Sequence, residues 1–177
     1  MATSWLQIGY WHDSITLWEH AIECADSDLA RLNLGQALAE SGARPEAREQ
    51  LLLALSLNPK NAKANFNLGR LLDEEGKPDE AIARYTEALR LDPAYTSAHS
   101  NLAIALARQG KLDRAIDHFI LALRSDPDDV KTHYNLALAF FQTGRRNESI
   151  YEFKEVLRLD PNYAPARDHL RALLNEK

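Results

Sequence analysis

Histidine, cysteine and paired carboxylates are the side chains of this chain with the most potential for chemistry, and their spacing is that of neither a metal site nor a catalytic site. Among the six histidines, His99 and His133 are separated by one unit of the repeat described below and could approach each other, while His12 and His20 lack a third ligand. Protein zinc sites use three or four Cys, His or carboxylate ligands. Cys24 is the single cysteine, so no internal disulfide is possible. The sequence therefore predicts no bound metal and no thiol chemistry.

The other polar motifs are typical of turns and solvated helix faces. Gly76-Lys77-Pro78 lacks the glycine-rich cradle and the following Ser or Thr of a phosphate-binding loop. Asp73 and Glu74 lie in a helical pattern, where a solvated surface explains paired carboxylates better than acid–base catalysis does. We therefore predict that the chain is not an enzyme and uses no cofactor.

Composition and charge exclude several further classes of protein. The 177 residues are 45% hydrophobic and 27% charged, as expected of an ordered, soluble chain. The net charge of -5 and the pI of about 5.7 provide no general attraction for nucleic acid or anionic lipid. There is no run of eighteen apolar residues and no signal-peptide pattern. We predict neither nucleic-acid binding nor direct membrane insertion.

A 34-residue period in the positions of proline and glycine organises the whole chain. The recurring residues are Pro59, Pro93, Pro127 and Pro161, and Gly42, Gly76, Gly110 and Gly144. The period divides the chain into four full repeats, residues 28–61, 62–95, 96–129 and 130–163. Residues 1–27 precede them and residues 164–177 follow them. A fixed period of this length indicates a repeat protein in which successive units stack.

Each unit contains two runs of apolar residues at helical spacing, which predict two amphipathic helices joined by a turn. In the repeat of residues 62–95 the first run includes Leu68 and Leu72, and the second includes Ile82 and Leu89. The glycine between the runs suits the left-handed residue that ends a helix. The later proline ends the second helix, because it lacks an N–H and its ring clashes with the preceding turn. The sequence thus predicts an all-α solenoid of helical hairpins.

Residues 67–93 resemble the tetratricopeptide repeat family, whose pattern NLGxxLxxxGxxxEAIxxYxxALxLDP they match almost letter for letter. The resemblance covers residues 28–163 outright, and it implies a right-handed superhelix with the first helices on the concave side. Residues 1–27 are expected to form a truncated N-terminal hairpin and residues 164–177 a C-terminal solvating helix. The aromatic residue usual near the start of the first helix is replaced, with an expected loss of packing, by Arg31, Asn65, His99 and His133.

A protein-interaction scaffold is the function that this resemblance implies, with a peptide or protein segment in the concave groove. One column of the first helices is Asn33, Asn67, Asn101 and Asn135. A carboxamide can both donate to and accept from a peptide main chain, and the similar repeats of protein O-GlcNAc transferases use such an asparagine ladder in this way. Asparagine in this column is also compatible with packing between hairpins. The neighbours predicted to complete the peptide-binding site are Lys63, Phe66, Arg70, Ile104, Lys131, Tyr134, Leu138 and Phe141.

Two other hypotheses compete with a free-standing scaffold. Residues 11–21 are similar to the first repeat after the membrane region of multi-pass glycosyltransferase-like proteins, so the chain could be a substrate-selecting or regulatory arm of a larger, membrane-anchored protein outside the cytoplasm. Otherwise a cytoplasmic location is the default expectation. The chain could also self-assemble through open repeat ends, and a homodimer through the N-terminal end would use a cluster of aromatic residues, Trp5, Tyr10, Trp11 and Trp18.

Overall fold

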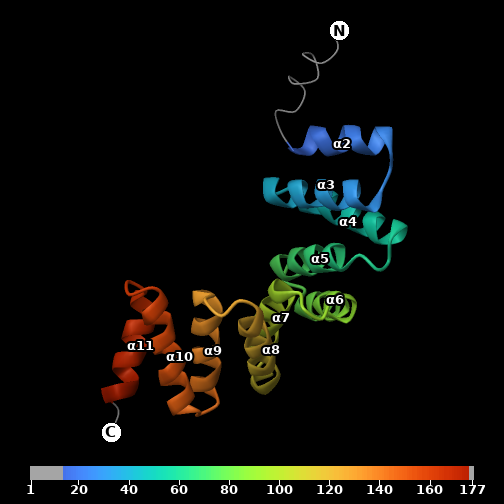
Figure 1. The fold of residues 1–177 in the computed structure, drawn as a ribbon. Helices are drawn as coiled ribbons and strands as arrows, with labels where there is room; N and C mark the ends of the chain where they lie inside the picture. Colours follow the sequence, from blue (N-terminus) through green and yellow to red (C-terminus); the bar gives the residue numbers. More distant parts are fainter. Residues whose placement is uncertain (1–13, 176–177) are drawn as a thin grey trace. The chain divides into compact units, whose positions relative to one another are not determined.

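The computed structural model describes residues 14–175, which form ten α-helices and no strand (Figure 1). This confirms the prediction of an all-α solenoid of helical hairpins. The first helix of the truncated hairpin was expected within residues 1–8, outside the described residues. The helices form two compact units, Met1–Asp92 and Pro93–Lys177, which are called unit 1 and unit 2 below.

Unit 1 contains a single helix and two hairpins. The helices are α2 (Ser14–Cys24), α3 (Asp28–Ser41), α4 (Arg44–Leu57), α5 (Ala62–Glu74) and α6 (Pro78–Leu91). Helix α3 pairs with α4, and α5 pairs with α6. Helix α2 packs on α3, α4 packs on α5, and the first helices α3 and α5 also touch.

Unit 2 repeats this arrangement with two hairpins and a final helix. Its helices are α7 (Thr96–Arg108), α8 (Leu112–Ser125), α9 (Val130–Gln142), α10 (Arg146–Leu159) and α11 (Ala164–Asn175). Helix α7 pairs with α8 and α9 with α10, while α8 packs on α9 and α10 on α11. The first helices α7 and α9 touch each other, so one face of unit 2 is formed by two first helices side by side.

The helices end where the sequence predicts, for local backbone reasons. Gly76 has a φ of +74°, the left-handed conformation that ends α5, and the next N–H, of Lys77, donates to the Leu72 carbonyl at 2.9 Å. At the end of α6 the Asp92 N–H donates to the Ala88 carbonyl at 2.8 Å, and Pro93 prevents a further helical hydrogen bond. The same two signals recur in each full repeat, which is why the hairpins have nearly equal lengths.

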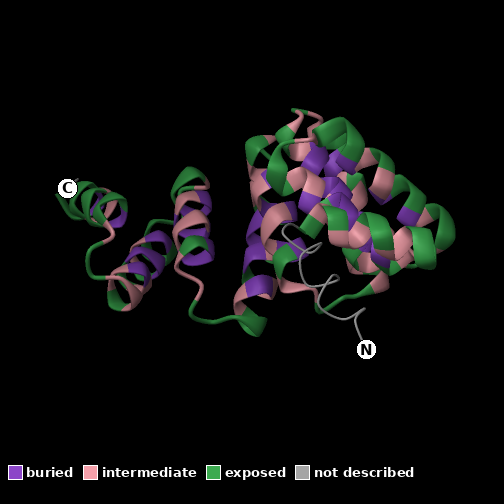
Figure 2. Cartoon of the chain, turned by 90° about the horizontal axis from the view of Figure 1, so that it is seen from above, coloured by how far each residue is buried: buried purple, intermediate pink, exposed green. Residues whose placement is uncertain are grey.

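Small residues of the first helices lie against large residues of the second helices. In unit 1, a Cβ atom added to Gly69 would lie 2.8 Å from the ring carbons of Tyr85, so only glycine allows α5 and α6 to approach this closely. In unit 2, Ala137 and Phe153 are both fully buried in one apolar cluster. The buried residues lie on the faces that neighbouring helices present to each other (Figure 2). Among residues 14–175, no helix is long and apolar enough to cross a membrane.

Candidate peptide-binding site

Two adjoining pockets lie between the first helices α7 and α9 of unit 2. The first, of about 230 Å³, is lined by Thr96, Ser97, Ser100, Asn101, Ile104, Asp126, Asp129, Lys131, Thr132 and Asn135. The second, of about 310 Å³, is lined by Ile104, Ala107, Arg108, Leu112, Phe119, Asn135, Leu138, Ala139 and Gln142. Ile104 and Asn135 line both pockets, which therefore adjoin each other. We call the two pockets together the α7–α9 groove.

Asn101 and Asn135 lie half-buried in the α7–α9 groove, one from each first helix. Within the part of the chain that the structure describes, neither side-chain amide has a hydrogen-bond partner. Asn58 and Asn61 differ, because both amides donate to the Asp28 carboxylate, at 2.7 and 2.9 Å. The groove amides thus keep their full capacity of two donors and one acceptor group for a bound molecule.

A chain of hydroxyl hydrogen bonds connects α7 to α9 at one end of the groove. Thr132 is buried, and its hydroxyl donates to the Asp129 carboxylate at 2.5 Å, since an ionised carboxylate can only accept. The Ser100 hydroxyl therefore donates to Thr132, also at 2.5 Å. Asp129 additionally caps α9 by accepting from the Lys131 N–H at 3.0 Å. These contacts set the spacing of the two helices, and no pattern in the sequence pointed to Ser100 or Thr132.

The floor of the second pocket is apolar and comes partly from the second helix α8. Leu112 and Phe119 of α8 join Ile104 of α7 and Leu138 of α9 as lining residues. This end of the groove provides an apolar surface beside a rim that includes the guanidinium-bearing Arg108. The sequence pointed to Ile104 and Leu138. Leu112 and Phe119 were missed, because second helices were not expected to reach the peptide-binding face.

Unit 1 has a separate pocket between α2 and α3, of about 140 Å³. We call it the α2–α3 pocket, and it is lined by Ser14, Trp18, Asn33, Gln36, Ala37 and Glu40. Asn33 is a member of the predicted ladder, and Gln36 and Glu40 follow it three and seven positions later on the same face of α3. Three of the four ladder asparagines, Asn33, Asn101 and Asn135, thus line a pocket.

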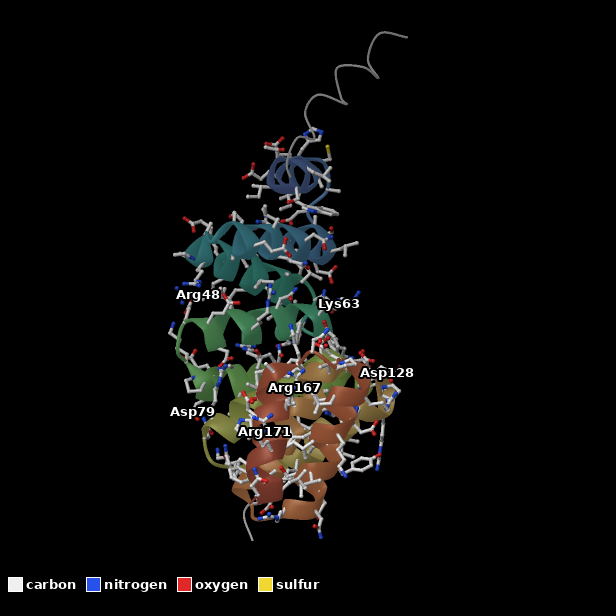
Figure 3. The ribbon with its side chains drawn as sticks, turned by 90° about the vertical axis from the view of Figure 1, so that its left-hand side faces the viewer. Arg48, Lys63, Asp79, Asp128, Arg167 and Arg171 are labelled. Atoms are coloured by element: carbon white, nitrogen blue, oxygen red, sulfur yellow. The ribbon has the colours of Figure 1, made fainter. Side chains whose placement is uncertain are left out.

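The other predicted residues of unit 1 lie on α5. Lys63 is exposed at the start of this helix, on the opposite side of the unit from Arg48 in the view of Figure 3. Asn67 and Arg70 are half-buried. The Phe66 ring contacts the Tyr85 ring of α6 with centroids 5.9 Å apart, so Phe66 packs within its own hairpin.

In unit 2, two of the predicted aromatic residues lie outside the α7–α9 groove. Tyr134 belongs to a cluster of rings, with centroids 5.8 Å from Phe153, 5.1 Å from Tyr163 and 6.1 Å from His169. Phe141 is 46% exposed on α9. Neither lines the two groove pockets, whereas the predicted Lys131 lines the first pocket.

The aromatic residues proposed for self-association are only partly within the described residues. Trp5, Tyr10 and Trp11 lie outside them. Trp18 lies on α2, is half-buried and lines the α2–α3 pocket. Association through the N-terminal end stays a prediction.

A family model for the tetratricopeptide repeat matches the chain three times, over residues 32–95, 66–130 and 100–164. Together these matches cover well over half of the sequence and follow the repeat period. The chain belongs to the tetratricopeptide repeat family.

Solved structures of other proteins, one of them described as a tetratricopeptide repeat protein, have a similar fold. YrrB, described as a protein with an unusual peptide-binding site, is 20% identical with a TM-score of 0.75, and the match covers 89% of this chain and 81% of that one. MamA of AMB-1 is 28% identical with a TM-score of 0.73 over 88% and 92% of the two chains. A chain of the APC/C Cut9–Hcn1 hetero-tetramer is 23% identical with a TM-score of 0.81, over 91% of this chain and 32% of that one. No curated protein matches the sequence.

The polar residues that replace the usual aromatic of the repeat are hydrogen-bonded, and three of them, Asn65, His99 and His133, are buried. Each forms a side-chain hydrogen bond with a residue at the same sequence separation, on the second helix of its own hairpin. The four pairs are Arg31–Gln50, Asn65–Arg84, His99–His118 and His133–Glu152. His99 and His133 therefore do not meet each other. Within residues 14–175, no three His, Cys, Asp or Glu residues are placed to hold a metal ion.

The two histidine pairs of unit 2 have opposite electrostatic behaviour. His133 Nδ1 lies 2.6 Å from the Glu152 carboxylate, and its Nε2–H donates to the Pro127 carbonyl at 2.9 Å. The hydrogen bond to Glu152 is the main reason that the pKa of His133 is raised. His118 Nδ1 instead lies 2.9 Å from His99 Nδ1. Burial, followed by the neighbouring His99 and Arg114, lowers the pKa of His118.

Proposed function

We propose that this tetratricopeptide repeat protein is an interaction scaffold that binds an extended peptide segment of a partner protein in the α7–α9 groove. The observation that carries the proposal is the placement of Asn101 and Asn135, half-buried in one groove and without a hydrogen-bond partner among the described residues. The two side-chain amides are therefore available to a ligand. A ligand that covered them without hydrogen bonding to them would lose affinity, because buried polar groups without partners cost free energy.

Hydrogen bonding to the main chain is the mechanism that these amides favour. A carboxamide donates to a peptide carbonyl and accepts from a peptide N–H, so two asparagines on neighbouring first helices can hold an extended chain irrespective of its side chains. The use of an asparagine ladder for the same purpose in the similar O-GlcNAc transferase repeats supports this assignment. The peptide-binding site named for YrrB supports a peptide as the class of ligand.

Selectivity would come from the apolar end of the groove. Ile104, Leu138 and Phe119 line a pocket with room for one large apolar side chain. Burying such a side chain contributes about 1.5–3 kcal/mol. A peptide held at its main chain by Asn101 and Asn135 and anchored by one apolar side chain fits the lining of both pockets.

The proposal is tested with peptides selected from a random displayed library against the whole chain. The double variant Asn101→Ala/Asn135→Ala should bind them about 10- to 100-fold more weakly, which corresponds to about 1–3 kcal/mol for lost hydrogen bonds. Methylating one peptide N–H at a time should weaken binding at the positions in contact more than truncating the neighbouring side chains to alanine. Isothermal titration calorimetry measures both effects.

The matched control is Asn147→Ala, which removes an exposed asparagine on α10 that lines neither pocket of the groove. It should leave binding unchanged, and all variants should keep the parent melting temperature. If the double variant binds like the parent protein, or melts well below it, the asparagines have a packing role and the groove loses its proposed main-chain contacts.

A further inference from the structure

The α2–α3 pocket of unit 1 combines an indole ring, two amides and one carboxylate. Trp18 comes from α2, and Asn33, Gln36 and Glu40 come from α3. We propose that this pocket binds the cationic end of a lysine or arginine side chain, presented by a peptide segment. The inference concerns a site separate from the α7–α9 groove, and it rests on the proposed function only in taking the cation from a peptide.

The hydrogen-bonding groups in the pocket favour a ligand that donates. Gln36 Nε2 donates to Glu40 Oε1 at 2.9 Å, which uses one donor of the Gln36 amide and holds the carboxylate in position. The Gln36 carbonyl oxygen, Glu40 Oε2 and the Asn33 carbonyl oxygen remain as acceptors. A lysine ammonium has three donors and an arginine guanidinium has five, and neither accepts a hydrogen bond.

The aromatic wall and the charge of the pocket favour the same ligand. Trp18 is half-buried, and an indole face is the strongest aromatic partner for a cation. Glu40 is the only charged residue among the described residues that line this pocket, and it contributes a negative charge. The α7–α9 groove differs, because the carboxylates of Asp126 and Asp129 are accompanied there by the cationic Arg108 and Lys131. A cationic side chain is therefore directed to the α2–α3 pocket.

The size of the pocket suits one linear side chain. Its volume of about 140 Å³ is several times the roughly 30 Å³ of a water molecule, which leaves room for the methylene stem of lysine along the indole and the ammonium at Glu40. This packing of the stem on an aromatic face is the usual way in which long cationic side chains bury their apolar part.

Nuclear magnetic resonance of the whole chain labelled with 15N-tryptophan tests the proposal. The chain has three tryptophans, and the variant Trp18→Phe identifies the indole signal of Trp18 by its loss. The probes are acetylated and amidated pentapeptides with lysine, arginine, norleucine or glutamate between alanines. The lysine and arginine peptides should shift the Trp18 signal in a saturable manner, and the norleucine and glutamate peptides should not.

Two charge-neutralising variants separate the pocket from the overall charge. Glu40→Gln keeps the shape of the side chain and should weaken binding of the lysine peptide by about 3- to 10-fold. Glu19→Gln removes the same charge from an exposed position on α2 outside the pocket lining, and it should leave the affinity unchanged. Circular dichroism confirms that each variant is folded.

Several outcomes would overturn the inference. One is that the lysine peptide causes no shift of the Trp18 signal at any concentration. Another is that the norleucine peptide causes an equal shift. A third is that Glu40→Gln and Glu19→Gln weaken binding of the lysine peptide equally. The groove variant Asn101→Ala/Asn135→Ala should retain the Trp18 response in full. Failure of the groove proposal and failure of this one are therefore seen in different variants.

Discussion

The two hairpins of unit 2 carry a histidine at the same position of the first helix but pair it with different residues. In α7–α8, His99 faces His118 with 2.9 Å between the two Nδ1 atoms. In α9–α10, His133 faces Glu152 at 2.6 Å. Both first-helix histidines are buried, and both lie with Nε2 at the carbonyl of the proline six positions earlier, at 3.0 and 2.9 Å. Only the partner on the second helix differs.

The partner determines which protonation state the hairpin favours. A carbonyl can only accept, so Nε2 of each first-helix histidine carries the proton. In α9–α10 a second proton on Nδ1 is needed to donate to Glu152, which favours the imidazolium. In α7–α8 a neutral His99 accepts at Nδ1 from the Nδ1–H of a neutral His118. A proton on each of the two facing nitrogens would place two N–H donors against each other with no acceptor between them. The two hairpins thus share the first-helix histidine, and the residue opposite it on the second helix distinguishes their hydrogen bonds.

Removing the carboxylate of the second pair should have the largest effect. Glu152→Ala leaves the buried Nδ1 of His133 without a partner and should destabilise the protein by about 2–3 kcal/mol. The melting temperature should fall by roughly 4–12 °C for a chain of this size. Thermal unfolding followed by circular dichroism at pH 6 measures the change.

Two further variants show whether the pair itself is responsible. His133→Phe/Glu152→Leu removes both partners and should recover most of the lost stability, because no buried polar group is left unpaired. Glu148→Ala breaks only the exposed ion pair with Arg145 and should change the stability by less than about 1 kcal/mol. A Glu152→Ala protein that melts like the parent would remove the proposed difference between the hairpins.

Converting one pair into the other sharpens the comparison. His118→Glu places a carboxylate opposite His99, at the same sequence separation as that between His133 and Glu152. The stability of α7–α8 should then increase rather than decrease in acid, by about 1 kcal/mol between pH 8 and pH 5 relative to the parent. Urea unfolding at the two pH values provides the measurement. An unchanged pH dependence would mean that the repeat position, and not the partner, sets the behaviour.

The smallest expected effect is the opposite pH dependence of the two histidines in the native protein. The raised pKa of His133 means that its stabilising contribution is complete below the unfolded value of about 6.5 and is lost as pH rises through the folded value. The lowered pKa of His118 means the reverse: its contribution is complete above about 6.5 and is lost as pH falls through the folded value.

Titration of the histidine ring signals by nuclear magnetic resonance measures this difference directly. The His133 signal should titrate above the ordinary histidine pKa of about 6.5, and the His118 signal below it. Arg114 lowers and Asp117 raises the pKa of His118, and Glu155 raises that of His133. Arg114→Gln should therefore move His118 toward the ordinary value. Coincident titration of His118 and His133 would contradict the assignment of their partners.

The helices and their ends could be predicted from the sequence because their causes are local. Gly76 ends α5 through its left-handed backbone and Pro93 prevents continuation of α6, and both effects need only a few neighbouring residues. The alternation of small and large residues was also visible, and Gly69 against Tyr85 follows it. The hydrogen-bond partners of Asn65 and His99 could not be predicted, because the sequence of one helix does not show which side chain its neighbour presents.

The candidate site was only partly visible in the sequence. The period placed Asn101 and Asn135 in one column, and α7 and α9 bring them to one groove. Tyr134 shares a helix with Asn135, yet its ring packs among Phe153, Tyr163 and His169 instead of lining the groove. Helical spacing gives the direction of a side chain, whereas its burial depends on the helix that packs against it.

By itself the sequence determined the repeat, the positions of the helix ends and the column of asparagines, because each follows from residue type and the repeat period. The tertiary structure alone decided that Ser100 and Thr132 connect α7 to α9, that Phe119 forms part of the groove floor, and that Trp18 and Glu40 line one pocket. These are contacts between helices, and they depend on how closely the axes approach and which faces meet. Those distances are set by the packing of all the side chains between two helices, which no single segment specifies.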